Sequence, residues 1–384
     1  MAKSTSLIIV SMIHAINHVY QFILPVAIPK IIIEYDLSHF SVGMLVACFS
    51  FSYALFQAPF GNLSNRFGRK LLMSLGLILN SLSLLLIGLV FTYSFNIWIF
   101  ALLLFLAGIG GSTYHPLGIS FLADAYAEKR GQVMGYHQTG GAIGSFISPL
   151  VIGGIILSFG WQSAFLALSF LGFLLSPLLW FYLNDTKNDT KRVLTPQKER
   201  GTKAYRPALL LILTSSIFIV GYRGLNAFGT QYFTEGKGVT YSEAIILFST
   251  LQIAGIFSGP ICGRLSDTFG RKKTVFALIT LNAFSLFLIT VAQGVPLYLA
   301  CTMSGFAIFG LLATTDAYLS DITPEEFLRT MIGVNLSASF IVGAVISPLL
   351  GNMIDIYGFT LSFAMLSITS LISILPLTRI RNLV

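Results

Sequence analysis

Four polar side chains near the start of the chain, His14, Asn17, His18 and Gln21, follow one another at intervals of three or four residues. In an α-helix this spacing places all four side chains on one face. Imidazole rings titrate near neutral pH and can carry a proton through a reaction cycle. The stretch therefore predicts a polar helix face that binds a solute, a proton or both.

A second pair of polar residues, Arg223 and Asn226, repeats the three-residue spacing in the later part of the chain. The guanidinium group of arginine is a planar fork of donors that suits the oxygens of a carboxylate or a phosphonate. Together with the imidazoles, it favours a solute that bears an anionic group. The candidate solute-binding residues are His14, Asn17, His18, Gln21, Tyr114, His115, Arg223 and Asn226.

Two further ionisable residues, His115 and Asp316, occupy nearly matching positions in the two parts of the chain. Both are candidates for proton coupling, because each can gain and lose a proton within an apolar segment. Asp316 has a second possible role as one partner of a structural ion pair with Arg223 or His115, and both roles stay open at this point. We expect His137, near the start of its segment, to be packed or to contact a loop.

These polar residues interrupt a chain that is 55% apolar and only 10% charged, whereas soluble domains are about 25% charged. A helix needs about 20 apolar residues to cross the hydrocarbon, and ionisable groups within such a helix usually face an aqueous cavity. The sequence predicts an all-α membrane protein with twelve transmembrane helices. The expected helices cover residues 6–33, 41–60, 71–91, 96–123, 132–158, 162–183, 207–233, 241–262, 274–293, 296–320, 330–354 and 359–378.

The basic residues indicate how the chain crosses the membrane. With twelve helices, 20 of the 23 Lys and Arg residues fall in the loops and termini of one side. Lys30 and Lys237 fall on the other side, and Arg223 falls within a helix. The positive-inside rule therefore predicts a multi-pass protein of the inner (plasma) membrane with both termini in the cytoplasm. Topology thus explains the net charge of +8, and we expect no nucleic-acid partner.

Motifs of enzymes are missing from the sequence. It has no metal-ligand spacing, nucleophile motif or phosphate-binding loop. The three cysteines, Cys48, Cys262 and Cys301, lie in or at the ends of apolar segments and indicate neither a disulfide framework nor a metal cluster. We therefore expect no enzymatic activity, no cofactor and no bound metal.

Two short sequences occur twice in the chain. The decamer GNLSNRFGRK, which begins at Gly61, returns as GRLSDTFGRK 202 residues later, and ISPL, which begins at Ile147, returns 199 residues later. Two matches at nearly the same offset indicate two homologous halves of six helices each. A charged segment without helical pattern between them is expected to be a flexible cytoplasmic linker. The expected units are a first bundle at 1–183, the linker at 184–206 and a second bundle at 207–384.

The repeated decamer resembles the signature loop that follows the second helix of each half in the major facilitator superfamily. The resemblance extends over the whole chain, because the helix count, the duplication and the linker all match. It implies two six-helix bundles related by an axis along the membrane normal, with a solute site between them. It also implies that the first and fourth helices of each half, which carry His14, His115, Arg223 and Asp316, line the central cavity.

The decamers are expected to act as gating loops. Their glycines permit tight turns and close helix approach, and their basic residues can hold the loops in the cytoplasm and latch one half to the other. A simpler role in setting topology explains the charges but not the glycines. The first copy has Asn65 where the second has Asp267, so it lacks a charge there for pairing with arginine. The candidate gating residues are Gly61, Asn65, Arg66, Gly68, Arg69, Gly263, Asp267, Gly270 and Arg271.

The segment GYHQTGGAIGSFISPLVIGG resembles the glycine-proline motif of proton-coupled antiporters in this superfamily, with Ser148 where that motif has glycine. Gly135 and Gly144 would let two helices approach closely, and Pro149 would let the helix bend. Generic packing of small residues is the alternative explanation. The motif favours export.

A narrower resemblance lies in GSTYHPLGISFLA, residues 111–123, and QTGGAIGSFISPL, residues 138–150, together with His14 and Asn17. These stretches are similar to the fosmidomycin-resistance branch of the superfamily, whose members are proton-driven exporters of a small phosphonate antibiotic. The arginine that drug antiporters carry in the fourth helix is replaced here by Leu104. Proton coupling therefore requires other residues.

The sequence thus predicts a monomeric secondary transporter in the lipid bilayer that exports a small organic solute or drug, preferably anionic, in exchange for protons. Uptake of an organic anion is the alternative with the same fold. A non-transporting membrane receptor or scaffold is the alternative of another class. The ionisable residues on the helices expected to line the cavity argue against the scaffold.

Overall fold

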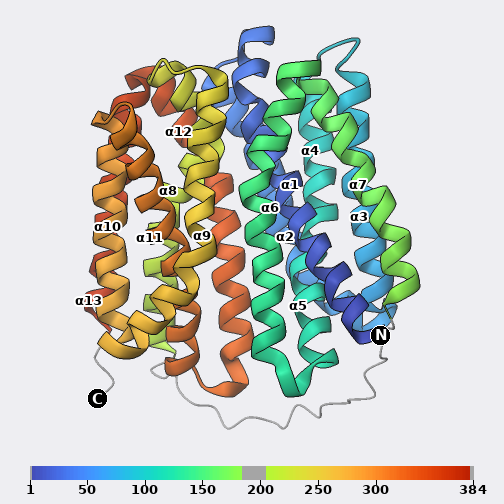
Figure 1. Cartoon of the computed structure of the whole chain (residues 1–384), viewed down its shortest axis with the longest axis vertical. Coiled ribbons are helices and arrows are strands. Elements are labelled where there is room, and N and C mark those ends of the chain that lie inside the picture. Colours follow the sequence, from blue (N-terminus) through green and yellow to red (C-terminus); the bar gives the residue numbers. More distant parts are fainter. Residues whose placement is uncertain (1, 184–204, 381–384) are drawn as a thin grey trace.

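The computed structural model describes residues 2–183 and 205–380, and all regular elements in these two ranges are helical (Figure 1). The expected linker at 184–206 lies almost entirely outside the described residues. The helices of the first half are α1 (Ala2–Tyr35), α2 (His39–Phe67), α3 (Arg69–Val90), α4 (Ile97–Ser112), α5 (Tyr114–Ala125), η1 (Ala127–Lys129), α6 (Arg130–Phe159) and α7 (Trp161–Tyr182). Those of the second half are α8 (Arg206–Gln231), the π-helical η3 (Tyr232–Gly236), α9 (Tyr241–Phe269), α10 (Arg271–Val291), α11 (Val295–Ile322), α12 (Glu325–Ile372) and α13 (Ile374–Thr378).

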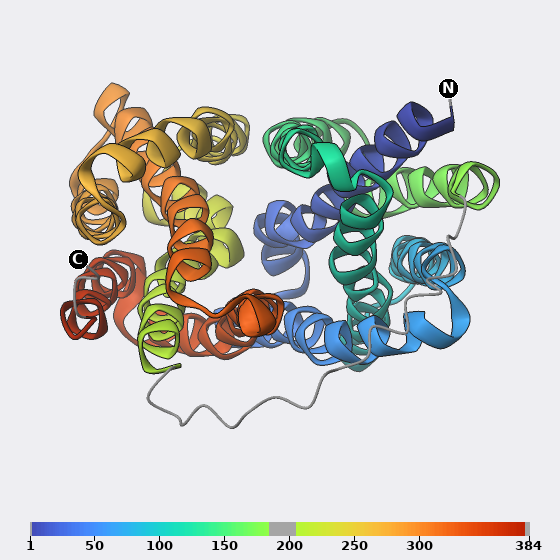
Figure 2. The ribbon, with the colours of Figure 1, turned by 90° about the horizontal axis from the view of Figure 1, so that it is seen from below.

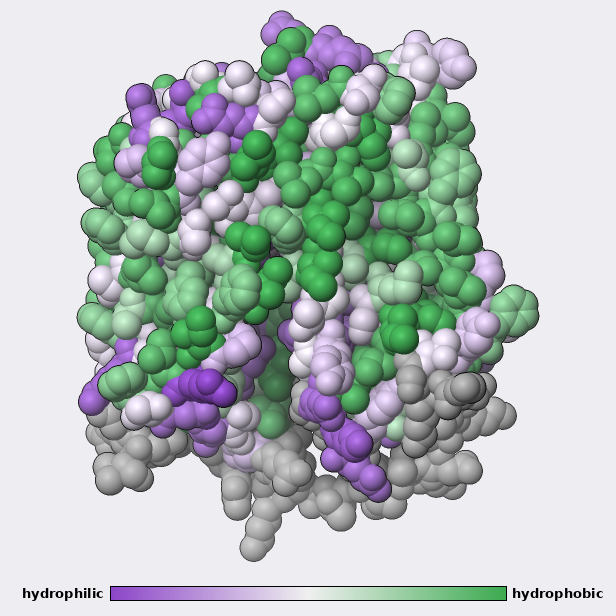
Figure 3. Space-filling model, viewed as in Figure 1, coloured by the Kyte–Doolittle hydropathy of each residue, from purple (hydrophilic) through white to green (hydrophobic). Residues whose placement is uncertain are grey.

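Eleven helical runs within the described ranges are long and apolar enough to cross a membrane. Helices α4 and α5 form one of these runs, with a break only at Thr113. Helical structure follows from the composition, because a chain in hydrocarbon has to satisfy its backbone hydrogen bonds internally. On the face seen in Figure 3, apolar side chains form a broad band between hydrophilic residues at the two ends.

The last run, residues 330–378, is interrupted at Gly358 (φ 76°, ψ 172°), which divides α12 into two helical stretches. Gly160, 198 residues earlier by number, has nearly the same conformation (φ 85°, ψ 163°) and separates α6 from α7. Gly68 and Gly270 form a second matched pair, with φ of 85° and 94°. Side chains with a Cβ rarely adopt such positive φ values. The two halves therefore repeat the same turns at the same places.

Polar side chains cap several helices at the end of the bundle opposite the termini. Ser38 accepts a hydrogen bond from the backbone N–H of Ser41, and Thr240 accepts one from Glu243. Asn96 caps α4 in the same way. Such caps satisfy N–H groups that have no partner within the helix. They define where the helices begin at this end.

Seen from below in Figure 2, the helices form two groups, α1–α7 and α8–α13. The most extensive contacts across the boundary join α2 with α12, α6 with α9, and α1 with α8. The beginning of α1 and the end of α13 lie toward the lower end of the molecule in Figure 1. This agrees with the prediction that the termini are on one side.

The two halves touch most closely at the end away from the termini. A Cβ atom on Gly43 of α2 would overlap the backbone of Ser347 in α12, and one on Gly351 would overlap the carbonyl of His39. Small residues permit such direct backbone contact between helices. At the opposite end, Figure 3 shows a hollow between the halves. The conformation is therefore closed at one end and open toward the termini.

Candidate functional site

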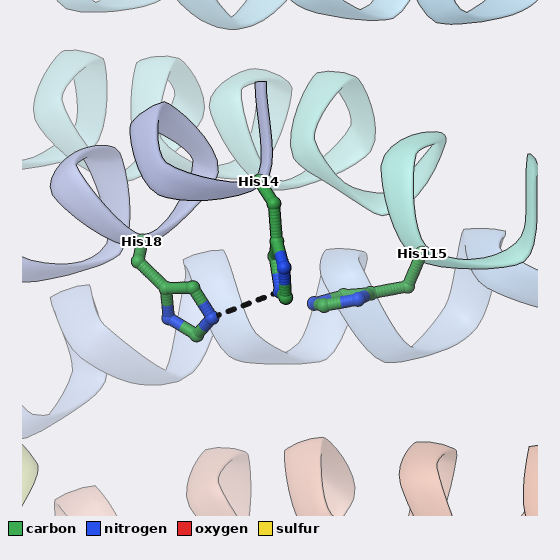
Figure 4. A group of neighbouring side chains, drawn as sticks. All are labelled: His14, His18 and His115. Carbon is green, nitrogen blue, oxygen red and sulfur yellow. Dashed lines mark hydrogen bonds between the residues drawn. The ribbon is translucent and has the colours of Figure 1, made fainter. Parts of the chain in front are cut away.

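Four histidines gather between α1, α5 and α6 in the first half. The Nδ1 atom of His14 lies 2.9 Å from the carbonyl oxygen of His137. A carbonyl only accepts hydrogen bonds, so His14 Nδ1 carries the hydrogen and, in a neutral ring, Nε2 accepts. The Nε2 atom of His18 lies 3.2 Å from His14 Nε2 and therefore donates to it (Figure 4). The fold thus fixes the tautomers of both rings.

The other two imidazoles pack around His14. The His137 ring stacks on it with ring centroids 4.2 Å apart, and the His115 ring meets it edge-on with centroids 5.3 Å apart. Ring nitrogens of His14, His18 and His115 all lie within 4.8 Å of one another, so this group is the place in the described chain that could hold a metal ion. A hydrogen bond already pairs two of these nitrogens. These three histidines are therefore the place at which the expectation of no bound metal can be tested.

Asn17 connects this cluster to the boundary between the halves. Its side-chain oxygen accepts hydrogen bonds from Gln21 Nε2 at 2.7 Å and from the Tyr53 hydroxyl at 3.0 Å, and its Nδ2 donates to the carbonyl of Gly111 at 3.2 Å. The Tyr53 ring in turn stacks on Phe340 of α12. The expected face of α1 is therefore a connected hydrogen-bond network, and it reaches the second half through an aromatic contact.

Arg223 of α8 lies on the other side of the boundary. Its Nε and Nη2 donate to the carbonyl and the hydroxyl of Ser339, at 3.0 and 2.9 Å, and its guanidinium lies 4.1 Å from the centre of the Phe340 ring. Among the side chains that the structure describes, no carboxylate forms an ion pair with Arg223. Two of the five N–H donors are used in these bonds. Donors therefore remain for an anionic ligand.

A central cavity joins residues of both halves. Gln21 and Ser50 line it from the first half, and Arg223, Asn226 and Phe340 line it from the second. Its volume is about 40 Å³, which is room for a few water molecules at most. A drug-sized solute therefore requires the halves to move. Of the predicted solute-binding residues, three line this cavity: Gln21, Arg223 and Asn226.

The remaining predicted contacts lie beside the cavity rather than in its wall. His14, Asn17 and His115 are buried in the first half, and His18 is half-buried. Tyr114 is buried as well, and its hydroxyl donates to the carbonyl of Val10 at 2.7 Å. Tyr114 therefore ties α5 to α1.

Asp316 of α11 is separate from the histidine cluster. Its carboxylate accepts a hydrogen bond from Asn335 of α12, whose side-chain oxygen accepts one from Ser215 of α8 at 2.5 Å. The residue is exposed, and through Asn335 it is connected to α12 and α8. The structural ion pair with Arg223 or His115, which the sequence left open, is not formed.

The decamer arginines form ion pairs in this conformation, in which the expected latch between the halves is not formed. Arg69 pairs with Asp124 of α5 at 2.6 Å, and Arg271 pairs with Asp321 of α11 at 2.8 Å and with Asp267. Each ion pair therefore stays within its own half, because in this conformation the halves are apart at this end. Asn65 and Arg66 are exposed.

The glycines of the decamers have different environments. Gly68 and Gly270 form the expected tight turns between helices, with positive φ. Gly61 and Gly263 lie inside α2 and α9. A Cβ atom on Gly61 would meet only ordinary contacts, and one on Gly263 would meet none. Close approach at these two positions was therefore predicted wrongly for this conformation.

The glycine-proline segment forms α6 and packs on α1. A Cβ atom on Gly144 would lie 2.5 Å from Ala15, whereas one on Gly135 would meet nothing within 4 Å. The prediction of close packing is confirmed at Gly144 and wrong at Gly135. Pro149 lies inside α6, beside Ser148, whose hydroxyl donates to the carbonyl of Gly144.

His137 was expected to be packed or to contact a loop, and it is buried with its ring stacked on His14. Sequence reasoning missed other residues of the site: Tyr20 and Phe340, which line the cavity, Tyr53, which stacks on Phe340, and Ser339, which binds Arg223. These four are aromatic and hydroxyl residues of kinds that recur throughout this chain. Their roles depend on which helices meet across the boundary.

The chain was compared with known proteins. A family model described as Major Facilitator Superfamily matches residues 10–263 and, separately, residues 211–382. The chain is 25% identical over 366 residues to the uncharacterized MFS-type transporter YfnC of Bacillus subtilis (strain 168), which covers 92% of this chain and 87% of that protein. It is 27% identical over 340 residues to the multidrug resistance protein MdtG of Rahnella sp. (strain Y9602), with 85% and 81% covered. A solved structure of a bacterial homolog to the human lysosomal transporter Spinster superposes with a TM-score of 0.78 at 18% identity, over 98% of this chain and 95% of that one.

Proposed function

Because the chain belongs to the major facilitator superfamily, we propose that it exports a small organic solute in exchange for protons by alternating access. One observation carries this proposal: polar residues of both halves, Gln21 and Ser50 from one and Arg223 and Asn226 from the other, meet at a single central cavity. A site shared by two halves can open to either side as they rock against each other. The similarity to multidrug resistance proteins supports export of a drug-like solute.

The membrane topology belongs to the same proposal. We propose two bundles at 1–183 and 207–384 and twelve spans in total, because the break at Gly358 divides the last apolar run in two. A continuous helix of 48 residues would be about 72 Å long, more than twice the thickness of the hydrocarbon. We propose that the protein lies in the inner (plasma) membrane with both termini in the cytoplasm, because the basic residues gather in the loops of that side. The hollow then opens to the cytoplasm.

The solute is proposed to be anionic. Arg223 keeps N–H donors unused by Ser339 and lines the cavity, so an oxygen-rich anion such as a phosphonate or a carboxylate can replace water there. The short matches to the fosmidomycin-resistance branch point to a phosphonate. We assign His115 and Asp316 to proton coupling, because one lies in the imidazole cluster and the other ends the hydrogen-bonded chain from Ser215 through Asn335.

The test uses the purified protein in liposomes that contain a pH-sensitive dye. A phosphonate, a carboxylate and a neutral hydrophobic drug are added in turn. Only a compound that is transported should cause proton movement, and we expect a larger change of dye signal with the two anionic compounds. Solute movement without any proton movement would contradict antiport. No movement of any compound, together with unchanged thermal stability in their presence, would favour the receptor or scaffold.

Uptake of an organic anion is distinguished by an imposed pH gradient. An exporter that exchanges solute for protons accumulates solute in the compartment from which protons leave. A carrier that moves solute and proton together accumulates solute in the compartment that protons enter. The direction of accumulation of a radiolabelled anion therefore separates the two functions.

A further inference from the structure

His39, the first residue of α2, joins the two halves at the end away from the termini. Its Nδ1 lies 2.7 Å from a carboxylate oxygen of Asp355 in α12, and its Nε2 lies 3.3 Å from a carboxylate oxygen of Glu235 in η3. Both acids belong to the second half. None of these three residues lines the central cavity.

The chemistry of this contact depends on protonation. Carboxylates only accept hydrogen bonds, and a neutral imidazole has a single N–H. Only the protonated ring can donate to Asp355 and Glu235 together, and it also gains two opposite charges. In the neutral form one ring nitrogen would present a lone pair to a carboxylate oxygen. Hydrogen bonds from the ring to both acids at once therefore require the protonated imidazole.

Asp355 is held in place independently of the imidazole. Its two side-chain oxygens also accept hydrogen bonds from the backbone N–H groups of His39, at 3.0 Å, and Phe40, at 2.9 Å. The acid thus caps the N-terminus of α2 from the opposite half, where the helix dipole favours a negative charge. Loss of the proton from His39 would weaken the contact without abolishing it.

The other groups around His39 do not supply a competing charge. The rings of Phe359 in α12 and Phe228 in α8 face it, with centroids 5.0 and 6.3 Å away. Glu235 also accepts a hydrogen bond from Gln231, and Lys237 donates to the carbonyls of Thr290 and Ala292 instead. Asp36 in the turn before α2 is exposed and forms no described contact with His39. Glu235 and Asp355 are therefore the charged groups that face the ring.

The same contact occurs where the halves are closed. A Cβ atom on Gly351, one turn before Asp355 in α12, would overlap the His39 carbonyl, and Gly43 is packed in the same way against Ser347. Separation of α2 from α12 at this end would pull His39 away from both acids. The ion pairs can therefore form only while this end is shut.

We propose that His39, Asp355 and Glu235 form a proton-binding latch that shuts the end of the transporter opposite the termini. A proton taken up from that side binds His39 and stabilises the conformation that is open toward the termini. The inference rests on the proposed function only for its role in the cycle, in which proton uptake from outside returns an emptied exporter to the side where solute is loaded.

The test measures the latch without any solute. Spin labels on the outer ends of α2 and α12, in a variant that lacks Cys48, Cys262 and Cys301, report the distance between the halves in nanodiscs. When the pH is lowered from about 8 to about 5.5, we expect the ratio of molecules closed at this end to molecules open at this end to rise roughly fivefold or more. His39→Gln should remove most of this rise, and His39→Lys, which keeps a positive charge, should stay closed at both pH values.

Variants of the acids at this end of the molecule test the latch, and Glu243 supplies the control. Glu235→Gln and Asp355→Asn should reduce the pH response, whereas Glu243→Gln, which removes an acid at the same end but without contact to His39, should keep it. The proposal would be overturned if the distance between α2 and α12 still responded to pH in His39→Gln. It would also be overturned if that distance did not respond to pH in the protein with His39, Asp355 and Glu235 all present. The distance measurement does not require transport. It can therefore support or contradict the latch even if the proton-exchange assay fails, and the proton-exchange assay can succeed even if the latch is disproved.

Discussion

The ring of Tyr53 lies flat against the ring of Phe340 across the boundary between the halves, with centroids 4.1 Å apart and planes 16° from parallel. The Phe340 ring also carries the guanidinium of Arg223 above it, and the Tyr53 hydroxyl donates to Asn17. This pair thus connects the polar network of α1 to the cation of α8. Phe340 also lines the central cavity.

We expect Phe340→Ala to lower the affinity for anionic solutes by roughly threefold to thirtyfold. Stacked aromatic pairs contribute about 0.5–1.5 kcal/mol, and a cation over a ring contributes about 0.5–2 kcal/mol. Removal of the Phe340 ring therefore leaves the Arg223 side chain less well positioned and weakens the contact between the halves. Tyr53→Phe keeps the stacking and removes only the bond to Asn17. If solute binding by thermal shift changes equally in both variants, the aromatic contact is not what positions Arg223.

Arg223→Ala should weaken transport of anionic solutes by roughly tenfold or more, because a hydrogen bond to a charged group contributes about 1.5–3 kcal/mol. Arg223→Lys keeps the charge but cannot reproduce the fork that bonds to Ser339, so we expect an intermediate loss. The measurement is uptake of paired anionic and neutral compounds into liposomes. An equal loss for neutral compounds would argue against an anion site.

His115→Ala and Asp316→Asn should each reduce solute-driven proton movement while leaving the melting temperature within a few degrees of the unmodified protein. Neither variant can bind a proton at the altered position, so solute exchange should become less dependent on pH. Ser215→Ala, which removes the outer member of the Asp316–Asn335–Ser215 chain, tests whether Asp316 needs that support. Unchanged coupling in both primary variants would remove these residues from the mechanism.

Much of the fold was predictable because a membrane imposes long apolar helices and because the chain repeats itself. The helices begin and end within several residues of the expected bounds in most cases, and the matched turns at Gly68 and Gly270 follow from the repeated decamer. Helices α2 and α9 extend further than expected, to Phe67 and Phe269, because a helix does not stop where its side chains become polar.

The site was predictable in its residue types but not in its grouping. The spacing of His14, Asn17, His18 and Gln21 correctly gave one helix face, since helical periodicity is local. Which residues that face meets depends on helix packing, so the stacking of His137 on His14 could not be read from spacing. His39 lay between two expected helices and received no role, because its partners are 196 and 316 residues away in sequence.

The contact between α1 and α6 supplies a prediction about stability with a control in the same helix. A Cβ atom on Gly144 would lie 2.5 Å from the Cα and carbonyl oxygen of Ala15, and backbone atoms cannot move aside as the end of a side chain can. We therefore expect Gly144→Ala to destabilise the protein by about 1–3 kcal/mol, the usual cost of an overpacked contact. Gly135→Ala meets nothing within 4 Å and should be neutral or slightly stabilising, because alanine favours helix. Thermal unfolding of both variants in detergent compares them, and an equal shift in the two would mean that α1 and α6 are not packed as closely as the backbone positions require.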